Sequence, residues 1–155
     1  ARMDQDSVGG IIECAAIGVP VGIGANIFFT VESHLSSILF GIPAVKGVQF
    51  GAGFDFAAMN GSQANDSYAV KDGRICLESN NNGGVLGGMT SGAPIVLSVV
   101  IKPTPSISKP QKSVNLQTME EETLVIKGRH DPCIVPRAVP VVEAAVAFGL
   151  LDLMM

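Results

Sequence analysis

Seven residues near the end of the chain, Lys127–Cys133 (KGRHDPC), concentrate charged and polar side chains that could do chemistry. Pro132 restricts the residue before it to extended backbone, and side chains alternate along extended backbone. Arg129 and Asp131 should therefore point to one side and His130 to the other. We expect Arg129 to keep Asp131 ionised. Such a pair can anchor an anion and relay a proton, or it can be a structural ion pair in a turn. His130 is more typical of a packed or hydrogen-bonding histidine than of a metal ligand.

A second segment presents one cation and two hydroxyls on stiff backbone, directly after a predicted strand, Ile95–Ile101. Its prolines hold the chain extended, so its polar groups lose little conformational entropy when they bind a ligand. This arrangement suits a phosphate group. The alternative is a stiff exit from a strand with a solvated lysine. The residues of the segment are Lys102, Pro103, Thr104, Pro105 and Ser106.

The third segment, Ser79–Gly92, is rich in glycine and asparagine. Backbone N–H groups without bulky side chains can approach an anion or a flat ring closely. The segment lacks the G-x-G-x-x-G of dinucleotide-binding folds and the G-K-[ST] of phosphate loops, so a glycine-rich hairpin explains it equally well. A fourth segment, Ile42–Phe54, is a helix stop that leads into a strand and a glycine turn, and its residues alone indicate scaffolding.

Composition argues against several classes of function. The chain has 10 Lys+Arg against 14 Asp+Glu and a net charge of −4, and therefore lacks the basic excess of nucleic-acid-binding proteins. Its three cysteines form no C-x-x-C pair, which argues against a zinc site or other metal site and against a disulfide framework. Glycines and prolines interrupt each long uncharged stretch, which argues against a membrane span. We expect a protein of the reducing cytoplasm, with no nucleic-acid or membrane partner.

The elements that position these segments indicate a single α+β domain, residues 1–155, built in layers. A helix is predicted over Val31–Phe40, capped by Thr30, with His34 on its exposed side. A final helix is predicted from Pro140, in its first turn, to Met155; it is apolar on nearly every face and needs cover from another segment or subunit. The predicted strands are Val8–Ile17, Val45–Phe50, Phe54–Ala58, Ile95–Ile101 and Leu124–Lys127.

Five segments, in their order and at their spacings, resemble the C-terminal part of the chorismate synthase family. The run RHDPC…RAVPVVE is the most specific of them, and the resemblance covers essentially the whole chain. The segments are Asp6–Gly10 (DSVGG), Ile42–Phe54, Ser79–Gly88, Lys102–Pro110 (KPTPSISKP) and Lys127–Glu143.

The resemblance implies a flavin-dependent lyase of the shikimate pathway, the route to aromatic amino acids. It converts 5-enolpyruvylshikimate 3-phosphate to chorismate and phosphate by an anti 1,4-elimination that requires reduced FMN, with NADPH as a candidate reductant. The family implies a layered β-α-β sandwich, of which this chain holds an incomplete part, and a homo-oligomer, typically a tetramer.

By position, Asp131 matches the family's catalytic acidic residue near flavin N5. The FMN contacts fall on Pro43, Ala44, Gly87, Lys102, Pro103, Thr104, Pro105, Ser106 and Arg129. The histidine motifs of the family's N-terminal part do not occur in the chain, so we expect the fragment alone to be inactive. We further expect Gly87, Lys102, Arg129 and Asp131 to converge on one pocket. The alternatives are a non-catalytic flavin- or phosphate-binding module and an assembly fragment.

Overall fold

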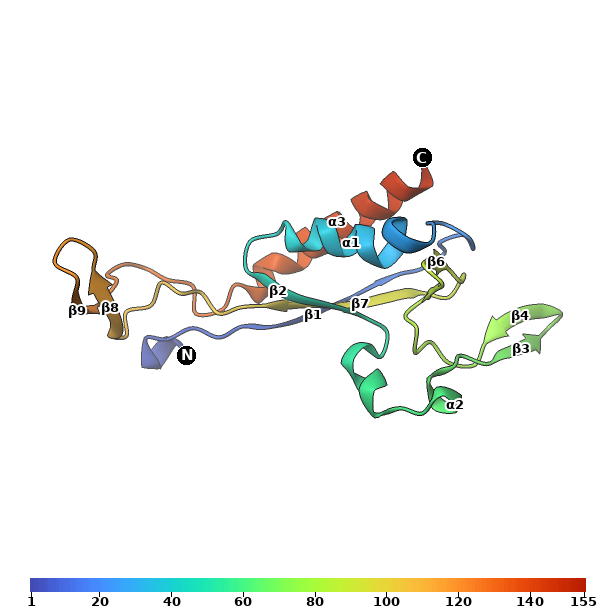
Figure 1. Ribbon diagram of the computed structural model, residues 1–155, viewed down its shortest axis with the longest axis horizontal. Coiled ribbons are helices and arrows are strands. Elements are labelled where there is room, and N and C mark those ends of the chain that lie inside the picture. The colour runs from blue at the N-terminus through green and yellow to red at the C-terminus, as the bar shows by residue number, and fades with distance from the viewer.

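The computed structural model describes residues 1–155 and has at its centre a three-stranded antiparallel sheet (Figure 1). Strand β7 (Ile95–Ile101) lies between β1 (Gly10–Ala16) and β2 (Val45–Phe50). Helices α1 (Val31–Phe40) and α3 (Val135–Met154) pack against each other and cover one face of this sheet. These two layers, one of strands and one of helices, confirm the α+β class.

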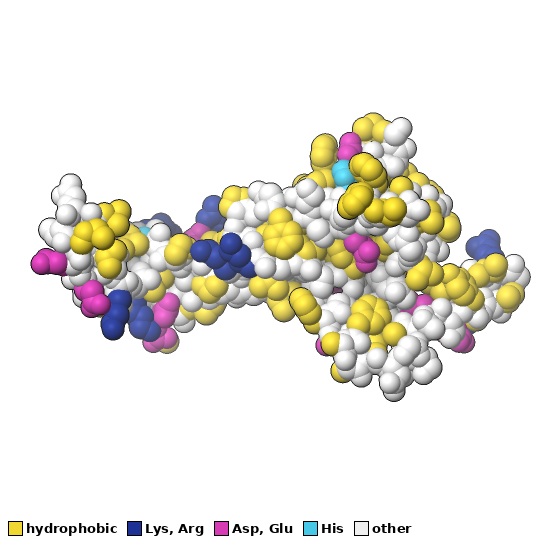
Figure 2. Space-filling view, in the orientation of Figure 1, with side chains coloured by type: hydrophobic (Ala, Val, Ile, Leu, Met, Phe, Trp, Pro, Cys, Tyr) yellow, Lys and Arg dark blue, Asp and Glu magenta, His cyan; other side chains and the backbone are white.

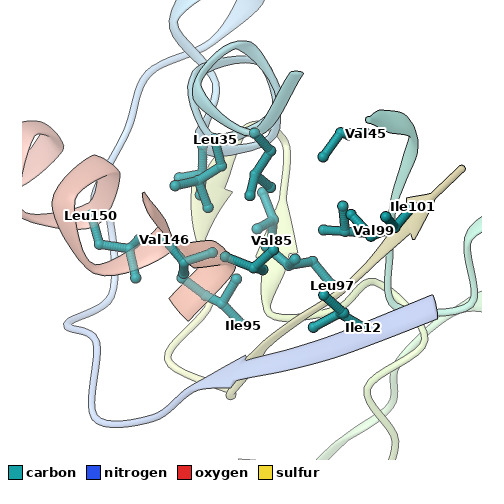
Figure 3. Packing of buried hydrophobic residues seen from close by; sticks show 13 residues of the cluster. Ile12, Leu35, Val45, Val85, Ile95, Leu97, Val99, Ile101, Val146 and Leu150 are labelled. Carbon is teal, nitrogen blue, oxygen red and sulfur yellow. The ribbon is translucent and has the colours of Figure 1, made fainter. Parts of the chain in front are cut away.

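The alternation of β7 explains why the helices lie on that face. Every second residue of the strand (Ile95, Leu97, Val99 and Ile101) is at most 1% exposed. These side chains meet Leu35 and Leu39 of α1 and Val142, Val146 and Leu150 of α3 in one cluster (Figure 3). Because strand side chains alternate, this single face of β7 supplies the centre of the core. The strands predicted at Val8–Ile17, Val45–Phe50 and Ile95–Ile101 are confirmed.

Helix α1 has the predicted bounds. The Thr30 side chain accepts a hydrogen bond from the Ser33 N–H (2.9 Å), as an N-cap does, and the chain leaves the helix at Gly41. His34 differs from the expectation. It lies toward α3, where its Nε2 is 3.1 Å from Oδ2 of Asp152, so it does not occupy a freely exposed side of the helix.

Several smaller elements surround this body, and two hairpins and a short helix extend away from it (Figure 1). Three hairpins are formed by β3 (Tyr68–Lys71) with β4 (Arg74–Leu77), β5 (Val85–Leu86) with β6 (Met89–Thr90), and β8 (Gln111–Asn115) with β9 (Glu120–Leu124). A short helix, α2 (Gly61–Ala64), and three 3₁₀ turns at Arg2–Asp4, Ile27–Phe29 and Gly53–Ala58 complete the chain. Two of the hairpins, β3–β4 and β8–β9, lie at opposite ends of the molecule.

Two predicted strands are wrong. Phe54–Ala58 forms a 3₁₀ turn, because Gly51 and Gly53 have positive φ and turn the chain away from β2. In place of a strand at Leu124–Lys127, β8 and β9 form a hairpin that ends at Leu124. The side chain of Asn115 accepts hydrogen bonds from the N–H groups of Gln117 and Thr118 and so closes the turn of this hairpin.

The final helix begins before its predicted first turn. It starts at Val135, so Pro136 lies in its first turn and Pro140 lies inside it. A proline is tolerated in the first turn, where its missing N–H would have no intrahelical partner. Pro136 and Pro140 are both compatible with a first helical turn, and the prediction placed Pro140 there. No helix of the structure combines the length and the apolar character needed to cross a membrane.

Large apolar side chains remain exposed on both layers. Phe148 and Leu151 of α3 are 63% and 57% exposed, and Ile11, on the sheet face opposite the helices, is 67% exposed. In Figure 2, hydrophobic side chains spread over the helices, whereas most Lys and Arg lie toward the end that carries the β8–β9 hairpin. The structure thus contains one sheet and one helical layer of the expected β-α-β sandwich.

Candidate functional site

One end of the central sheet gathers three segments that are far apart in the sequence. Both β1 and β2 run antiparallel to β7, and Gly10 and Val45 both pair with Ile101. The residues that precede β1, those that precede β2 and those that follow β7 must therefore meet at this end. The backbone N–H of Lys102 donates to the carbonyl oxygen of Ala44 over 2.9 Å. Thus the structure brings together the predicted pairs Pro43–Ala44 and Lys102–Pro103.

The backbone at this sheet end is tightly constrained. A Cβ on Gly9 would collide with the carbonyl oxygen of Ile101 and lie 3.1 Å from Cδ of Pro103, so only glycine fits there. Ala44 has a φ of +74°, in the left-handed region that a residue with a side chain seldom adopts. Such strain persists only where the surroundings hold it, and it occurs frequently at functional sites.

The N-terminal segment joins the two polar segments identified in the sequence. The Ser7 hydroxyl donates to the carbonyl oxygen of Thr104 (2.6 Å), and the next N–H, that of Val8, donates to the carbonyl oxygen of Pro132 (2.8 Å). The Lys102–Ser106 segment and the segment that contains Arg129 and Asp131 are therefore both bonded to Ser7–Val8. The sequence analysis named Asp6–Gly10 as part of the family resemblance but placed none of its residues at the site.

An ion pair strengthens the same junction. Nζ of Lys109 lies 3.0 Å from Oδ2 of Asp6, and the Ser7 N–H donates to Oδ1 of Asp6 (2.9 Å). The Ser7 N–H, together with Lys109, lowers the pKa of Asp6 below its ordinary value. The ionised carboxylate of Asp6 thus ties the N-terminal segment to the chain that follows Lys102.

A hollow of about 200 Å³ opens between these segments, and most of the residues that line it are polar or charged. Arg129 lines it, is exposed, and forms no hydrogen bond or ion pair within the chain, so its guanidinium is available to an anion. Half-buried Lys102, at the sheet end, likewise has no side-chain partner. The hollow is lined by Arg2, Gln5, Asp6, Ile107, Ser108, Gly128, Arg129, His130 and Pro132.

Asp131 has a different partner from the one predicted. Its Oδ2 accepts a hydrogen bond from Nη1 of Arg137, in the first turn of α3, and Arg129 does not pair with it. The helix places Arg137 at a fixed position, whereas Arg129 lies outside any regular element. His130 has its Nε2 3.2 Å from the carbonyl oxygen of Ile126, which agrees with a hydrogen-bonding histidine.

Thr104 carries a buried polar atom without a partner. Its Oγ1 has essentially no accessible surface and forms no hydrogen bond in the chain. A buried hydroxyl without a partner costs free energy, and native proteins contain few of them. At a site that holds an anion, this hydroxyl would gain an acceptor.

Gly87 does not join the other predicted site residues. It lies in the tight turn of the β5–β6 hairpin, and the carbonyl oxygen of Gly88 accepts the N–H of Val31 at the start of α1 (3.0 Å). In the sequence, this hairpin comes directly after the segment that is hydrogen-bonded to the Ile95 end of β7. Lys102 comes directly after the opposite end of that strand (Figure 1). A strand rises roughly 3.3 Å per residue, so the length of β7 alone separates them by about 20 Å. The four residues expected in one pocket do not form one within this chain.

The chorismate synthase family model matches residues 1–155, that is, the whole chain. The chain belongs to the chorismate synthase family. The chorismate synthase of Thermococcus gammatolerans is 57% identical over 152 residues, which are 98% of this chain and 43% of that protein. That of Archaeoglobus fulgidus is 55% identical over 98% of this chain and 42% of its own length.

A solved structure described as "Crystal Structure of Chorismate Synthase" superposes with a TM-score of 0.77 at 32% identity, over 97% of this chain and 38% of that one. The fold is therefore part of the chorismate synthase fold. The chain spans less than half the length of the curated relatives that it matches.

Two residues at or near the predicted segments of this family member escaped the sequence analysis. Arg137 was overlooked because the helix was expected to begin after it. Asp66 organises the Ser79–Gly84 loop, but thirteen or more residues separate it from its partners in the sequence. The only local signal is the Asn65–Asp66 pair, because both residue types are typical of turns.

Proposed function

We propose that this chain forms the C-terminal part of a chorismate synthase, a carbon–oxygen lyase. The complete enzyme would convert 5-enolpyruvylshikimate 3-phosphate to chorismate and phosphate with reduced FMN. The observation that carries this proposal is made at one end of the central sheet. There, the Ala44–Lys102 backbone hydrogen bond and the Ser7–Thr104 hydrogen bond bring together segments that the family uses for FMN. Membership of the family supports the reaction.

The donors at this sheet end and in the neighbouring polar hollow suit the phosphate tail of a flavin. Lys102 and Arg129 offer unpaired positive charge, and the buried Oγ1 of Thr104 lacks an acceptor. Charge-assisted hydrogen bonds from such groups to phosphate are the strong ones. FMN would be held by Pro43, Ala44, Lys102, Pro103, Thr104, Pro105, Ser106 and Arg129. When bound, reduced FMN would supply electron density as phosphate leaves the substrate.

In this proposal Asp131 is the catalytic residue: its carboxylate would lie near N5 of the bound flavin and would share the proton that leaves C6 of the substrate. One carboxylate oxygen is occupied by Arg137, which orients the group, and the carboxylate remains half exposed and able to meet a ligand. Arg129 provides positive charge beside the departing phosphate or the flavin, a form of electrostatic stabilisation.

The proposed site is not completed within this chain. The proposed contact of Gly87 with FMN needs a second copy or the remainder of the protein, because Gly87 lies near the far end of β7 from Lys102. We therefore propose a homo-oligomer, as the tetramer of the family implies. NADPH as reductant and a cytoplasmic location complete the proposal.

A chimera tests this proposal. Residues 1–155 replace the corresponding part of the Thermococcus gammatolerans chorismate synthase, which is 57% identical in this region. Chorismate formation is followed by absorbance under anaerobic conditions with reduced FMN. We expect turnover, lost on Asp131→Asn and kept on Asp72→Asn, an exposed aspartate in the β3–β4 turn. A soluble, FMN-loaded chimera without turnover contradicts the proposal. Unchanged turnover in Asp131→Asn contradicts the role of Asp131 and favours a module that merely binds flavin.

A further inference from the structure

The carboxylate of Asp66 is surrounded by donors from one loop. Its Oδ1 accepts the Ser79 hydroxyl (2.6 Å) and the Asn81 N–H (2.7 Å). Its Oδ2 accepts the backbone N–H and the side-chain amide of Asn82, at 2.9 and 2.8 Å. A carboxylate has about four acceptor positions, and all of them are used here. Asp66 is therefore a structural anchor with no free lone pair for a metal ion or a substrate proton.

The electrostatics of Asp66 agree with this role. Partial burial disfavours the charged form, but the bonds from Ser79, Asn82 and Asn81 outweigh burial and lower the pKa of Asp66 to about 2. Hydrogen bonds to the ionised form have this effect on any carboxylate. Asp66 thus stays ionised, and keeps its four bonds, throughout the pH range in which enzymes work.

The anchored loop is itself bonded to the ends of two strands of the sheet. The Ala52 N–H, just beyond β2, donates to the carbonyl oxygen of Asn81 (2.7 Å). The side-chain amide of Asn80 donates to the carbonyl oxygen of Pro94 (2.9 Å), just before β7. Asp66 therefore holds one side of a loop whose other side is fixed to the central sheet.

The position of the loop also fixes the position of the β5–β6 hairpin, which follows it directly in the sequence. Gly83 and Gly84 are buried at positive φ, and a Cβ on Gly83 would lie 2.7 Å from the carbonyl oxygen of Val96. The next residue, Val85, is 3% exposed and belongs to the core. Only Leu86 then separates these buried residues from Gly87, so the hairpin has little freedom to move independently of the loop.

We propose that Asp66 is a positioning residue of the cofactor site: its bonds to Ser79, Asn81 and Asn82 place the β5–β6 turn and Gly87 for contact with FMN. This inference rests on the proposed function, since that assigns Gly87 to the cofactor. Asp66 and Asn82 also line a hollow of about 260 Å³ with Leu86, so the anchor shapes the surface beside Gly87.

The test measures FMN affinity, thermal stability and turnover separately in the chimera. Asp66→Asn replaces one acceptor oxygen by an NH₂ group that faces donors, and Ser79→Ala removes a single bond. We expect Asp66→Asn to raise the Kd for FMN by about tenfold or more and Ser79→Ala by about threefold. The rate at saturating FMN should stay near that of the parent, because neither residue touches the reacting atoms. Asp72→Asn makes the same charge change in the β3–β4 turn and should alter none of the three quantities.

A merely structural role predicts a different pattern. If Asp66→Asn and Ser79→Ala lower the melting temperature while the FMN Kd stays at the parent value, the inference is overturned. If Asp66→Asn does not fold, Ser79→Ala alone decides, because it leaves the other three bonds in place. If the parent chimera binds no FMN, the proposed function fails and this inference fails with it. Faster hydrogen exchange at the Asn81 and Asn82 amides in Ser79→Ala would then still establish the anchor.

Discussion

Arg137 in the first turn of α3 donates a hydrogen bond to Oδ2 of Asp131 and thereby leaves Arg129 without an anionic partner in the chain. The two arginines therefore have different surroundings, although only eight positions separate them in the sequence. Arg137 is held by a helix and oriented toward a carboxylate, whereas Arg129 lines the polar hollow with its charge free. Their substitution should have different consequences.

We expect Arg129→Gln to weaken FMN binding by about tenfold to a hundredfold, because a charge-assisted hydrogen bond contributes about 1.5–3 kcal/mol. Arg137→Gln should leave the FMN Kd near that of the parent and lower kcat, because Asp131 loses the group that orients it. Flavin fluorescence titration and anaerobic turnover of the chimera measure the two effects. Equal losses of FMN affinity in both variants would contradict this division of roles.

Local sequence patterns predicted the elements that form the core. The i, i+4 spacing of Val31, Leu35 and Leu39 and the cap at Thr30 placed α1 at its observed bounds, because its propensity, capping and burial all agree. The apolar run Ile95–Ile101 placed β7 equally well. Prediction succeeded where short-range signals and burial point to the same structure.

Contacts between distant segments could not be predicted in this way. The bonds from Ser7 to Thr104 and from Ser79 to Asp66 depend on how the strands order themselves in the sheet. Nor could alternation identify the partner of Asp131, because a helix that begins at Val135 brings Arg137 within reach. Gly87 and Lys102 do not converge within the chain, because the β5–β6 hairpin stays at the Ile95 end of β7 and does not fold back along the strand.

The core prediction concerns Leu35, which is completely buried between the sheet and α3. Leu35→Ala removes buried methyl groups and leaves a cavity, so it should lower the free energy of unfolding by about 2–5 kcal/mol. Leu116→Ala, in the exposed β8–β9 turn, should change it by less than about 0.5 kcal/mol. Urea denaturation of the chimera, followed by circular dichroism, gives both values. Comparable midpoints for the two variants would show that the cluster in Figure 3 does not form.

Two glycines with similar φ but different surroundings test the packing of the anchored loop. Gly83 (φ 61°) abuts the backbone of Gly51 and Val96, whereas an added Cβ at Gly73 (φ 72°) would meet nothing within 4 Å. Gly73→Ala should therefore cost only the left-handed strain, about 1–2 kcal/mol. Gly83→Ala adds a backbone collision and should cost about 1–3 kcal/mol more. Thermal melts of the two variants compare them directly, and a Gly83→Ala variant as stable as Gly73→Ala contradicts the described packing.

The lowered pKa of Asp66 predicts a dependence of stability on pH. Its pKa falls from an ordinary value of 3.8 in the unfolded chain to about 2 in the folded one. The unfolded state thus takes up the proton first, so the stabilisation is complete above about pH 4 and disappears as the pH falls toward 2. Urea midpoints between these limits should decline more steeply in the parent chimera than in Asp66→Asn. The Asp72→Asn variant should follow the parent, and identical slopes in all three proteins would exclude the anchor as a source of acid sensitivity.

The unpartnered hydroxyl of Thr104 should affect the stability of the folded chain and the binding of a ligand in different ways. Removal of a buried hydroxyl that makes no bond relieves a desolvation cost, so Thr104→Val should leave the stability of the flavin-free protein unchanged or raise it by about 1 kcal/mol. If the hydroxyl meets the phosphate tail of FMN, the same substitution should weaken FMN binding by about fivefold or more. Thr123→Val, at an exposed threonine of β9 outside the polar hollow, is the matched control. Melting temperatures and FMN titrations of both variants measure the two effects. A Thr104→Val variant that binds FMN as tightly as the parent would place the flavin phosphate away from this residue.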